Sequence, residues 1–268
     1  MSSKIAEYID SFINICILIV GLVLLFVGTY SMIDNLYVYQ NAVDKSLKIY
    51  RPSVDEPMTV SQKITDDQVG WIVMDDTSID YPVMQGDDNA LYLNRDPYGN
   101  FSLSGSIFLD SRNDSRFRDH YSLIYGHHMA GDIMFGALDK YVDEDYYTSH
   151  KIGHLVTSDA VYDYQLFCVI ADYGTNSLLF NPKKGTYDEI LSYLRENSMF
   201  YEEPPENLKL LCLSTCSGSS TDRLLIVGTL KSSSDIVSRI KYFLSSDISD
   251  DVGGFLDRCV SGLFGYIK

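Results

Sequence analysis

The chain has 268 residues, of which 46% are hydrophobic and 13% aromatic, with only seven prolines. This composition excludes a disordered, collagen-like or coiled-coil protein and supplies apolar residues for one good-sized core. Acidic residues outnumber basic ones by 37 to 21, and the formal charge of −16 argues against nucleic-acid binding, because phosphate recognition needs a basic face. Five cysteines are too few for a disulfide scaffold, and their odd number leaves at least one thiol unpaired within the chain.

An uncharged apolar segment lies near the N-terminus. Residues 11–33, between Asp10 and Asp34, are mostly Ile, Leu, Val, Phe and Gly. A helix of this length spans a hydrocarbon core of roughly 30 Å. The alternative is a cleaved signal peptide, whose apolar region is usually about 7–15 residues long and ends at a small-residue cleavage site. We therefore expect residues 1–33 to form a short cytoplasmic tip and one transmembrane anchor, although the flanking basic residues do not by themselves set its orientation.

Residues 34–66 are predicted to connect this anchor to the rest of the chain. Apolar residues recur loosely over 35–50 without Gly or Pro, which favours a stalk helix. Pro52 and Pro57, among polar residues, indicate a linker over 51–66.

Residues 67–231 have the pattern of a β-rich domain, in which short apolar runs are separated by Gly, Asn and Asp turns. The candidate strands are 70–74, 79–84, 105–109, 121–125, 151–157, 162–173, 208–215 and 224–230. Eight short strands in a domain of this size predict a closed or nearly closed β-barrel. Helical patterns interrupt the strands at 89–94 and 133–141, and a longer helix with an apolar stripe is predicted over 186–199.

The C-terminal tail, residues 232–268, carries apolar residues at helical spacing. We expect two amphipathic helices packed on the domain. A membrane-surface helix is the alternative, but the second helix has only Arg258 and Lys268 to meet lipid headgroups.

Two segments carry residues that could perform chemistry. Tyr125-Gly126-His127-His128-Met129 follows one predicted strand, and Cys216 ends another shortly before Arg223. A thiolate is a nucleophile, a nearby imidazole can take its proton, and a guanidinium can stabilise an oxyanion. Spacing alone leaves two alternatives open. The histidines could simply lie on the surface and the thiol be free without a role, or the histidines and cysteines could form a metal site. The metal site is disfavoured because a regular strand separates Cys212 from Cys216 by ~13 Å.

These segments resemble the sortases, the membrane-anchored cysteine transpeptidases of Gram-positive bacteria. Tyr125-Gly126-His127 matches the histidine motif of that family, and Leu213-Ser214-Thr215-Cys216 followed by Arg223 matches its Leu-x-Thr-Cys…Arg motif. The similarity covers roughly residues 35–231, and segments 69–72, 79–83, 105–110 and 134–135 follow in the order of the family. A helix before the barrel and a long helix before the cysteine strand are features of class B.

The resemblance implies an eight-stranded sortase-like barrel with helices. It assigns Cys216 as the nucleophile, His127 as the general acid and base, and Arg223 as the oxyanion or substrate stabiliser. It places Tyr125, Ser214 and Thr215 along the substrate groove. It implies neither cofactor nor metal. His128 occupies a variable position of the family, the spacing from Cys216 to Arg223 is short for class B, and the tail has no counterpart.

The implied reaction takes place outside the cell membrane. The enzyme cleaves a C-terminal sorting signal of a secreted protein through a thioacyl intermediate and joins the acyl group to an amine of a peptidoglycan cross-bridge or of a pilin lysine. One alternative is an anchored cysteine peptidase that only hydrolyses. The other is a non-catalytic β-barrel surface module. Cys16, Cys168 and Cys259 are expected to be structural, and Cys212 shares the strand face of Cys216 and could line the same groove.

Overall fold

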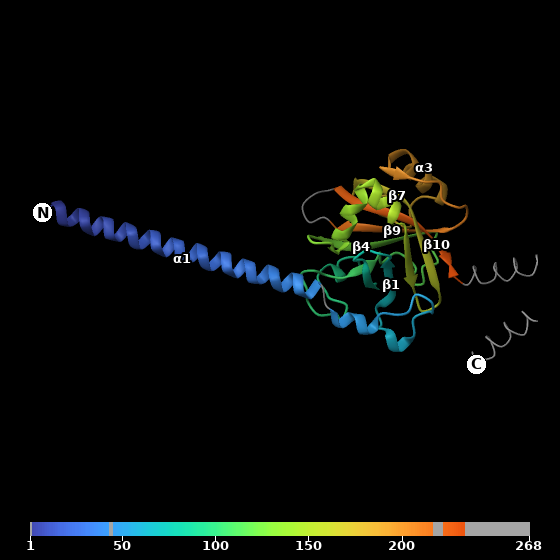
Figure 1. The fold of residues 1–268 in the computed structure, drawn as a ribbon, viewed down its shortest axis with the longest axis horizontal. Helices are drawn as coiled ribbons and strands as arrows, with labels where there is room; N and C mark the ends of the chain where they lie inside the picture. The colour runs from blue at the N-terminus through green and yellow to red at the C-terminus, as the bar shows by residue number, and fades with distance from the viewer. Residues whose placement is uncertain (1, 43–44, 217–221, 234–268) are drawn as a thin grey trace, which may run out of the picture.

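The computed structural model describes residues 2–42, 45–216 and 222–233 (Figure 1). Its helices are α1 (Ser2–Ala42), α2 (Glu144–Ser149) and α3 (Tyr187–Asn197), with 3-10 helices η1 (Lys45–Tyr50), η2 (Val60–Gln62), η3 (Leu91–Leu93) and η4 (Phe135–Val142). Its strands are β1 (Gln68–Met74), β2 (Asp80–Met84), β3 (Ile107–Leu109), β4 (Tyr121–Met129), β5 (Ile133–Met134), β6 (Ile152–Val156), β7 (Val161–Tyr173), β8 (Phe200–Tyr201), β9 (Lys209–Cys216) and β10 (Asp222–Ser232).

Within these described residues, eight strands close into a barrel. Hydrogen-bonded neighbours follow the order β10-β9-β4-β3-β2-β1-β6-β7, and β7 pairs back with β10 to complete the ring. The β2–β3 and β4–β9 pairs are parallel, whereas the other neighbours in the ring are antiparallel. The two-residue strands β5 and β8 extend the sheet from β4 and β7. The predicted eight-stranded barrel is confirmed, and each predicted strand corresponds to one strand of the ring.

Alternate residues of β9 enter two different cores. Leu211 and Leu213 of β9 belong to the core inside the barrel. Cys212, between them, belongs to a second core on the outer face, beneath Ile190 and Leu194 of α3. This alternation follows from the two-residue period of a strand. Burial on both faces explains why β9 and β10 read as nearly continuous apolar runs.

Helix α3 covers the outer face of the barrel (Figure 1). Thr186 is its N-cap, and its hydroxyl accepts a hydrogen bond from the Glu189 amide while the Glu189 carboxylate accepts one from the Thr186 amide. Ile190 and Leu194, one turn apart, form its fully buried stripe. The helix predicted over 186–199 is therefore confirmed, with its first residue acting as the cap.

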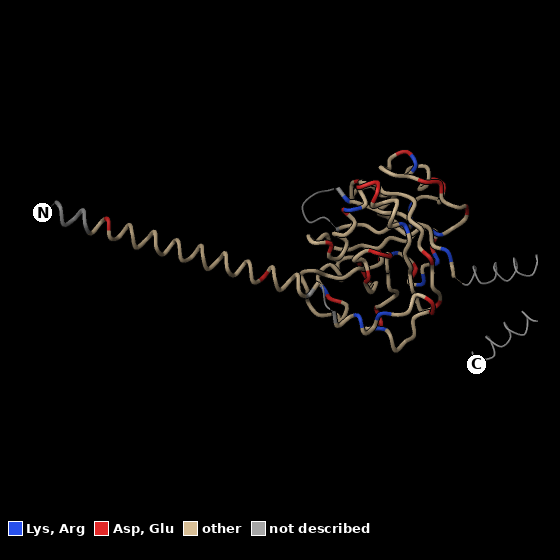
Figure 2. Tube along the Cα trace, viewed as in Figure 1, with Lys and Arg blue, Asp and Glu red and all other residues tan. Residues whose placement is uncertain are grey.

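Helix α1 projects from the barrel as a long rod that carries almost no charge (Figures 1 and 2). Its segment Tyr8–Gln40 has a mean hydropathy of 2.7 and is long and apolar enough to cross a membrane. Contact with the barrel core begins only at Val38 and Tyr39, and Ala42 is buried there. The predicted stalk helix is thus the end of α1 followed by η1.

The segment predicted as a linker, 51–66, lies against the barrel. Met58 is buried in a cluster with Trp71 and Val156, and Val54 and Ile64 pack on the same cluster. The prolines in this segment prevent regular helix over much of its length but do not prevent its apolar side chains from packing.

Two helical predictions need correction, and a third concerns residues that the structure does not describe. The pattern at 89–94 forms only the 3-10 turn η3, and that at 133–141 forms β5 and the 3-10 helix η4. Helix α2 was not predicted, because its six residues are too few to display an apolar period. The tail predicted over 232–268 lies outside the described residues apart from Ser232 and Ser233.

Candidate active site

Parallel pairing of two strands brings the predicted histidine to the predicted nucleophile. The β4–β9 register runs from Tyr121 opposite Leu210 to His127 opposite Cys216. Strand β9 ends at this pair, whereas β4 continues for two residues. Two motifs far apart in the chain therefore meet at one end of the barrel.

Arg223 reaches the same end from the other side of β9. The antiparallel β9–β10 register places Leu225 opposite Ser214, and Arg223 and Cys216 lie two residues farther along their strands. The Arg223 side chain is half-buried, and its Nη1 donates a hydrogen bond of 3.2 Å to the carbonyl oxygen of Thr215. The guanidinium is thereby held against the last residues of β9. Neighbouring strands β4, β9 and β10 thus bring all three predicted catalytic residues to one place.

The environment of His127 favours its neutral form. The side chain is half-buried, and its Nδ1 atom is buried with no hydrogen-bond partner among residues that the structure describes. Burial lowers the pKa of His127 below its ordinary value of 6.5, because the charged imidazolium loses hydration. A neutral imidazole is the form that can accept a proton from a thiol.

Gly126 permits the close packing of β4 just before His127. A Cβ atom at Gly126 would lie 2.4 Å from Cδ1 of Ile107 and 2.6 Å from Cγ of Phe135. Both neighbours are fully buried core residues, so neither side chain can shift without disturbing the packing around it. The glycine of the Tyr-Gly-His motif is therefore a packing requirement that sets the position of the histidine.

His128 is separated from His127 by strand alternation. Its side chain is exposed, and its Nε2 lies 2.6 Å from a carboxylate oxygen of Asp139 on η4. Because successive residues of a strand point to opposite faces, this pair lies away from the face of His127.

The three residues predicted to line the substrate groove have different surroundings. Tyr125 is half-buried opposite Ser214 in the β4–β9 register, and its hydroxyl donates to Asp110 at 3.2 Å. Ser214 is buried and its hydroxyl donates to the Thr215 carbonyl at 3.2 Å. Thr215 is also buried, and its hydroxyl accepts from the Leu224 amide at 3.2 Å. The Thr215 side chain is thus used to join β9 to β10.

The other described cysteines are not placed for catalysis. Cys212 lies on the outer face of β9 but is fully buried beneath α3. This burial raises the pKa of its thiol to about 12. Burial likewise raises the pKa of Cys168 in β7 to about 12. Such thiols stay protonated at neutral pH and are poor nucleophiles. Cys16 is exposed on α1, and Cys259 lies outside the described residues.

No protein-family model matches the chain. The sortase B of Listeria monocytogenes is 31% identical over 179 residues, which cover 63% of this chain and 72% of that relative. The chain belongs to the sortase B family. Its structure is similar to that of a Streptococcus pyogenes class B sortase involved in pilus biogenesis, with a TM-score of 0.59, 35% identity, and coverage of 63% of this chain and 94% of that one. It is also similar to a Staphylococcus aureus sortase B–substrate complex, with a TM-score of 0.60 and 29% identity. That match covers 64% of this chain and 83% of the other.

The recognised resemblance is thereby confirmed, and so is the enzyme class, a sortase-type cysteine transpeptidase. The barrel, the N-terminal apolar helix and the helix before the cysteine strand agree with the class B expectation.

The buried position of Asp110 in this sortase was not predicted from the sequence. Asp110, directly after β3, has a fully buried carboxylate that accepts hydrogen bonds from Asn89, Arg112 and Tyr125. In the sequence it is an acidic residue directly after an apolar strand, at the end of the family-like segment 105–110. That signal does not distinguish an exposed turn residue from a buried one.

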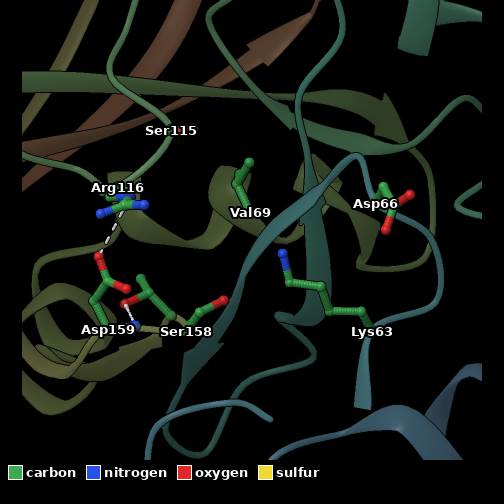
Figure 3. A pocket seen from close by; sticks show the side chains of 8 residues that line it. Lys63, Asp66, Val69, Ser115, Arg116, Ser158 and Asp159 are labelled. Atoms are coloured by element: carbon green, nitrogen blue, oxygen red, sulfur yellow. Dashed lines mark hydrogen bonds and ion pairs between the residues drawn. The ribbon is translucent and has the colours of Figure 1, made fainter. Parts of the chain in front are cut away.

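The sortase also has a charged pocket of about 290 Å³ at the other end of the barrel (Figure 3). Lys63 and Asp66 lie on one side of Val69, and Arg116 pairs with Asp159 at 3.6 Å on the other. These residues come from segments preceding or opening β1, β4 and β7, whereas His127 lies near the far end of β4. Across the described part of the chain, no group of three His, Cys, Asp or Glu side chains is placed to hold a metal ion.

Proposed function

We propose that this sortase uses Cys216 as its nucleophile, His127 as its general acid and base, and Arg223 as the stabiliser of the oxyanion. The β4–β9 register carries the proposal, since it sets His127 opposite Cys216. The neutral state favoured for His127 suits the first proton transfer. The contact of Arg223 with the end of β9 supports its assigned role.

In the first half of the reaction, the Cys216 thiol gives its proton to His127 and the sulfur attacks the scissile carbonyl of a sorting signal. Arg223 stabilises the negative oxygen of the tetrahedral intermediate. The C–N bond then breaks, and the imidazolium of His127 protonates the departing amine. The product is a thioacyl enzyme, in which the acyl group is a thioester of Cys216.

In the second half, an acceptor amine attacks the thioester carbonyl and loses a proton to His127. The C–S bond breaks, a new amide forms, and the thiolate recovers its proton from the imidazolium. The acceptor is an amine of a peptidoglycan cross-bridge or of a pilin lysine. The pilus option is supported by the similar Streptococcus pyogenes enzyme, which is described as involved in pilus biogenesis.

We further propose that residues 11–33 anchor the enzyme in the cell membrane, with the barrel of residues 67–231 outside the cell. The apolar segment of α1 supports the anchor. The residues before 11 would then form a cytoplasmic tip, and residues 34–66 would connect the anchor to the barrel. An enzyme held there meets exported substrates and wall precursors together.

The test uses the soluble chain lacking residues 1–33 as wild type, Cys216→Ala and Cys212→Ala. Each is incubated with a panel of sorting-signal peptides, with or without triglycine, and the products are read by mass spectrometry. We expect a thioacyl adduct on Cys216 that resolves to a peptide–triglycine product. Cys216→Ala should lose essentially all turnover.

The Cys212→Ala control removes a thiol of the same strand and should retain turnover, because Cys212 is buried under α3. Cleavage without an amine product from any acceptor would favour the peptidase alternative. Turnover that survives Cys216→Ala would overturn the assignment of the nucleophile.

A further inference from the structure

A buried carboxylate joins several segments beside the proposed catalytic residues. The Asp110 side chain is 0% exposed. It accepts hydrogen bonds from Nδ2 of Asn89 at 2.9 Å, from the Tyr125 hydroxyl at 3.2 Å, and from Nε and Nη2 of Arg112 at 2.8 and 2.5 Å. These donors lie before η3, on β4 and after β3. A buried charge with this many donors is a rigid junction, since moving any partner leaves part of the charge unpaired.

Arg112 extends this junction to a distant part of the chain. The same Nη2 that pairs with Asp110 also donates to the Phe180 carbonyl at 2.8 Å. Phe180 belongs to the loop between β7 and α3, residues 174–186. This loop is also held by the Tyr121 hydroxyl, which donates to the Leu179 carbonyl at 2.9 Å. Arg112 is therefore one of the groups that fix the loop on the outer face of β4.

Tyr125 packs near both segments that Asp110 and Arg112 connect, residues 89–93 and residues 178–180. It packs against the buried cluster of Met84, Tyr92 and Phe108, on which Leu91 and Leu93 also pack. It packs as well against the buried cluster beneath α3, on which Leu178 and Phe180 also pack. His127 follows two residues later on the same face of β4. The positions of the two segments thus affect the surroundings of Tyr125, two residues before His127.

We propose that the Asp110–Arg112 pair is a positioning unit that holds residues 89–93 and residues 178–180 at the correct separation for the sorting signal. This inference rests on the proposed function, because it takes the outer face at Tyr125 as the peptide-binding surface. The pair touches no reacting atom, so it acts through Tyr125 and the two flanking segments. Its loss should weaken peptide binding without changing the reactivity of Cys216.

Arg112→Lys is the sharpest test of the positioning unit. Lysine keeps the positive charge, but its ammonium cannot present the planar fork that serves Asp110 and the Phe180 carbonyl together. We expect KM for the sorting-signal peptide to rise about tenfold, the size of one charge-assisted hydrogen bond, with kcat little changed. The rate of Cys216 alkylation by iodoacetamide, which needs no peptide-binding surface, should stay at the wild-type value.

Arg118→Lys is the matched control. Arg118 lies in the same segment before β4 and pairs with Asp114 at 2.6 Å, but its side chain is 65% exposed and reaches neither flanking segment. Its KM should equal that of wild type. Equal KM values in the two variants would overturn the proposal. A parallel fall in the alkylation rate of Arg112→Lys would also overturn it, since the pair would then act on the thiol.

A second variant and a structural readout separate this proposal from the proposed function. Asp110→Asn keeps an acceptor for Tyr125 while removing the charge that orients Arg112, and it should raise KM in the same way. If no peptide is turned over by wild type, the proposed function fails but the positioning can still be measured. Amide hydrogen exchange over residues 176–184 should then be faster in Arg112→Lys than in Arg118→Lys, and equal exchange would overturn the positioning role.

Discussion

His127 has a half-buried ring, and burial lowers its pKa below 6.5. As the pH falls through this lowered pKa, the ring becomes charged and can no longer accept the thiol proton. Activity should therefore persist below pH 6.5 and decline only at lower pH. We expect the acid limb of the kcat/KM profile to have a midpoint below 6.5, because that limb reports the free enzyme.

The measurement is kcat/KM for a sorting-signal peptide between pH 4.5 and 8, accompanied by NMR titration of the His127 ring. Far-UV circular dichroism at each pH controls for acid unfolding. An acid midpoint above 6.5 in both measurements would show that a partner stabilises the imidazolium, in contradiction to the buried Nδ1, which has no partner in the described part of the chain.

At the scale of secondary-structure elements, α3 begins at a capping box formed by Thr186 and Glu189. Thr186→Ala removes the side-chain acceptor of the Glu189 amide and should reduce the free energy of unfolding by about 1 kcal/mol. For a domain of this size the thermal midpoint should fall by about 2–4 °C. Differential scanning calorimetry of the chain lacking residues 1–33 checks the prediction.

Thr175→Ala serves as the control for this cap. Thr175 is exposed in the loop before α3, so its replacement should change the free energy of unfolding by less than about 0.5 kcal/mol. Equal midpoints for the two alanine variants would mean that the capping box contributes nothing to the stability of the barrel.

Where its side chains are described, the long helix α1 contacts the barrel only near its C-terminal end. Side chains over 8–37 are exposed, whereas Val38, Tyr39 and Ala42 pack against the core. Removing residues 1–33 should therefore leave the thermal midpoint of the barrel unchanged and move the protein from the membrane fraction to the soluble fraction. Membrane sedimentation and thermal unfolding test the two effects separately.

A chain lacking residues 1–42 is the matched comparison. It also loses the three core-packing residues, so its midpoint should fall below that of the chain lacking residues 1–33. A chain lacking residues 1–33 that still sediments with membranes as wild type does would contradict the proposal that residues 11–33 anchor the enzyme.

Features that depend on neighbouring residues could be predicted from the sequence. The eight barrel strands follow from short apolar runs between turn residues, and α3 follows from the stripe of Ile190 and Leu194 after Thr186. The sortase resemblance likewise rests on short motifs around His127 and Cys216. Each of these signals lies within a few residues, so no long-range contact is needed to recognise it.

The tertiary structure decided what depends on pairing between distant segments. The parallel β4–β9 register determines that His127 lies opposite Cys216, and the α3 contact determines that Cys212 is buried rather than available. The buried Asp110 carboxylate accepts hydrogen bonds from two other parts of the chain, at Asn89 and Tyr125, as well as from nearby Arg112. Strand registers and buried polar contacts are selected by the packing of the whole core, and residue spacing along the chain does not encode them locally.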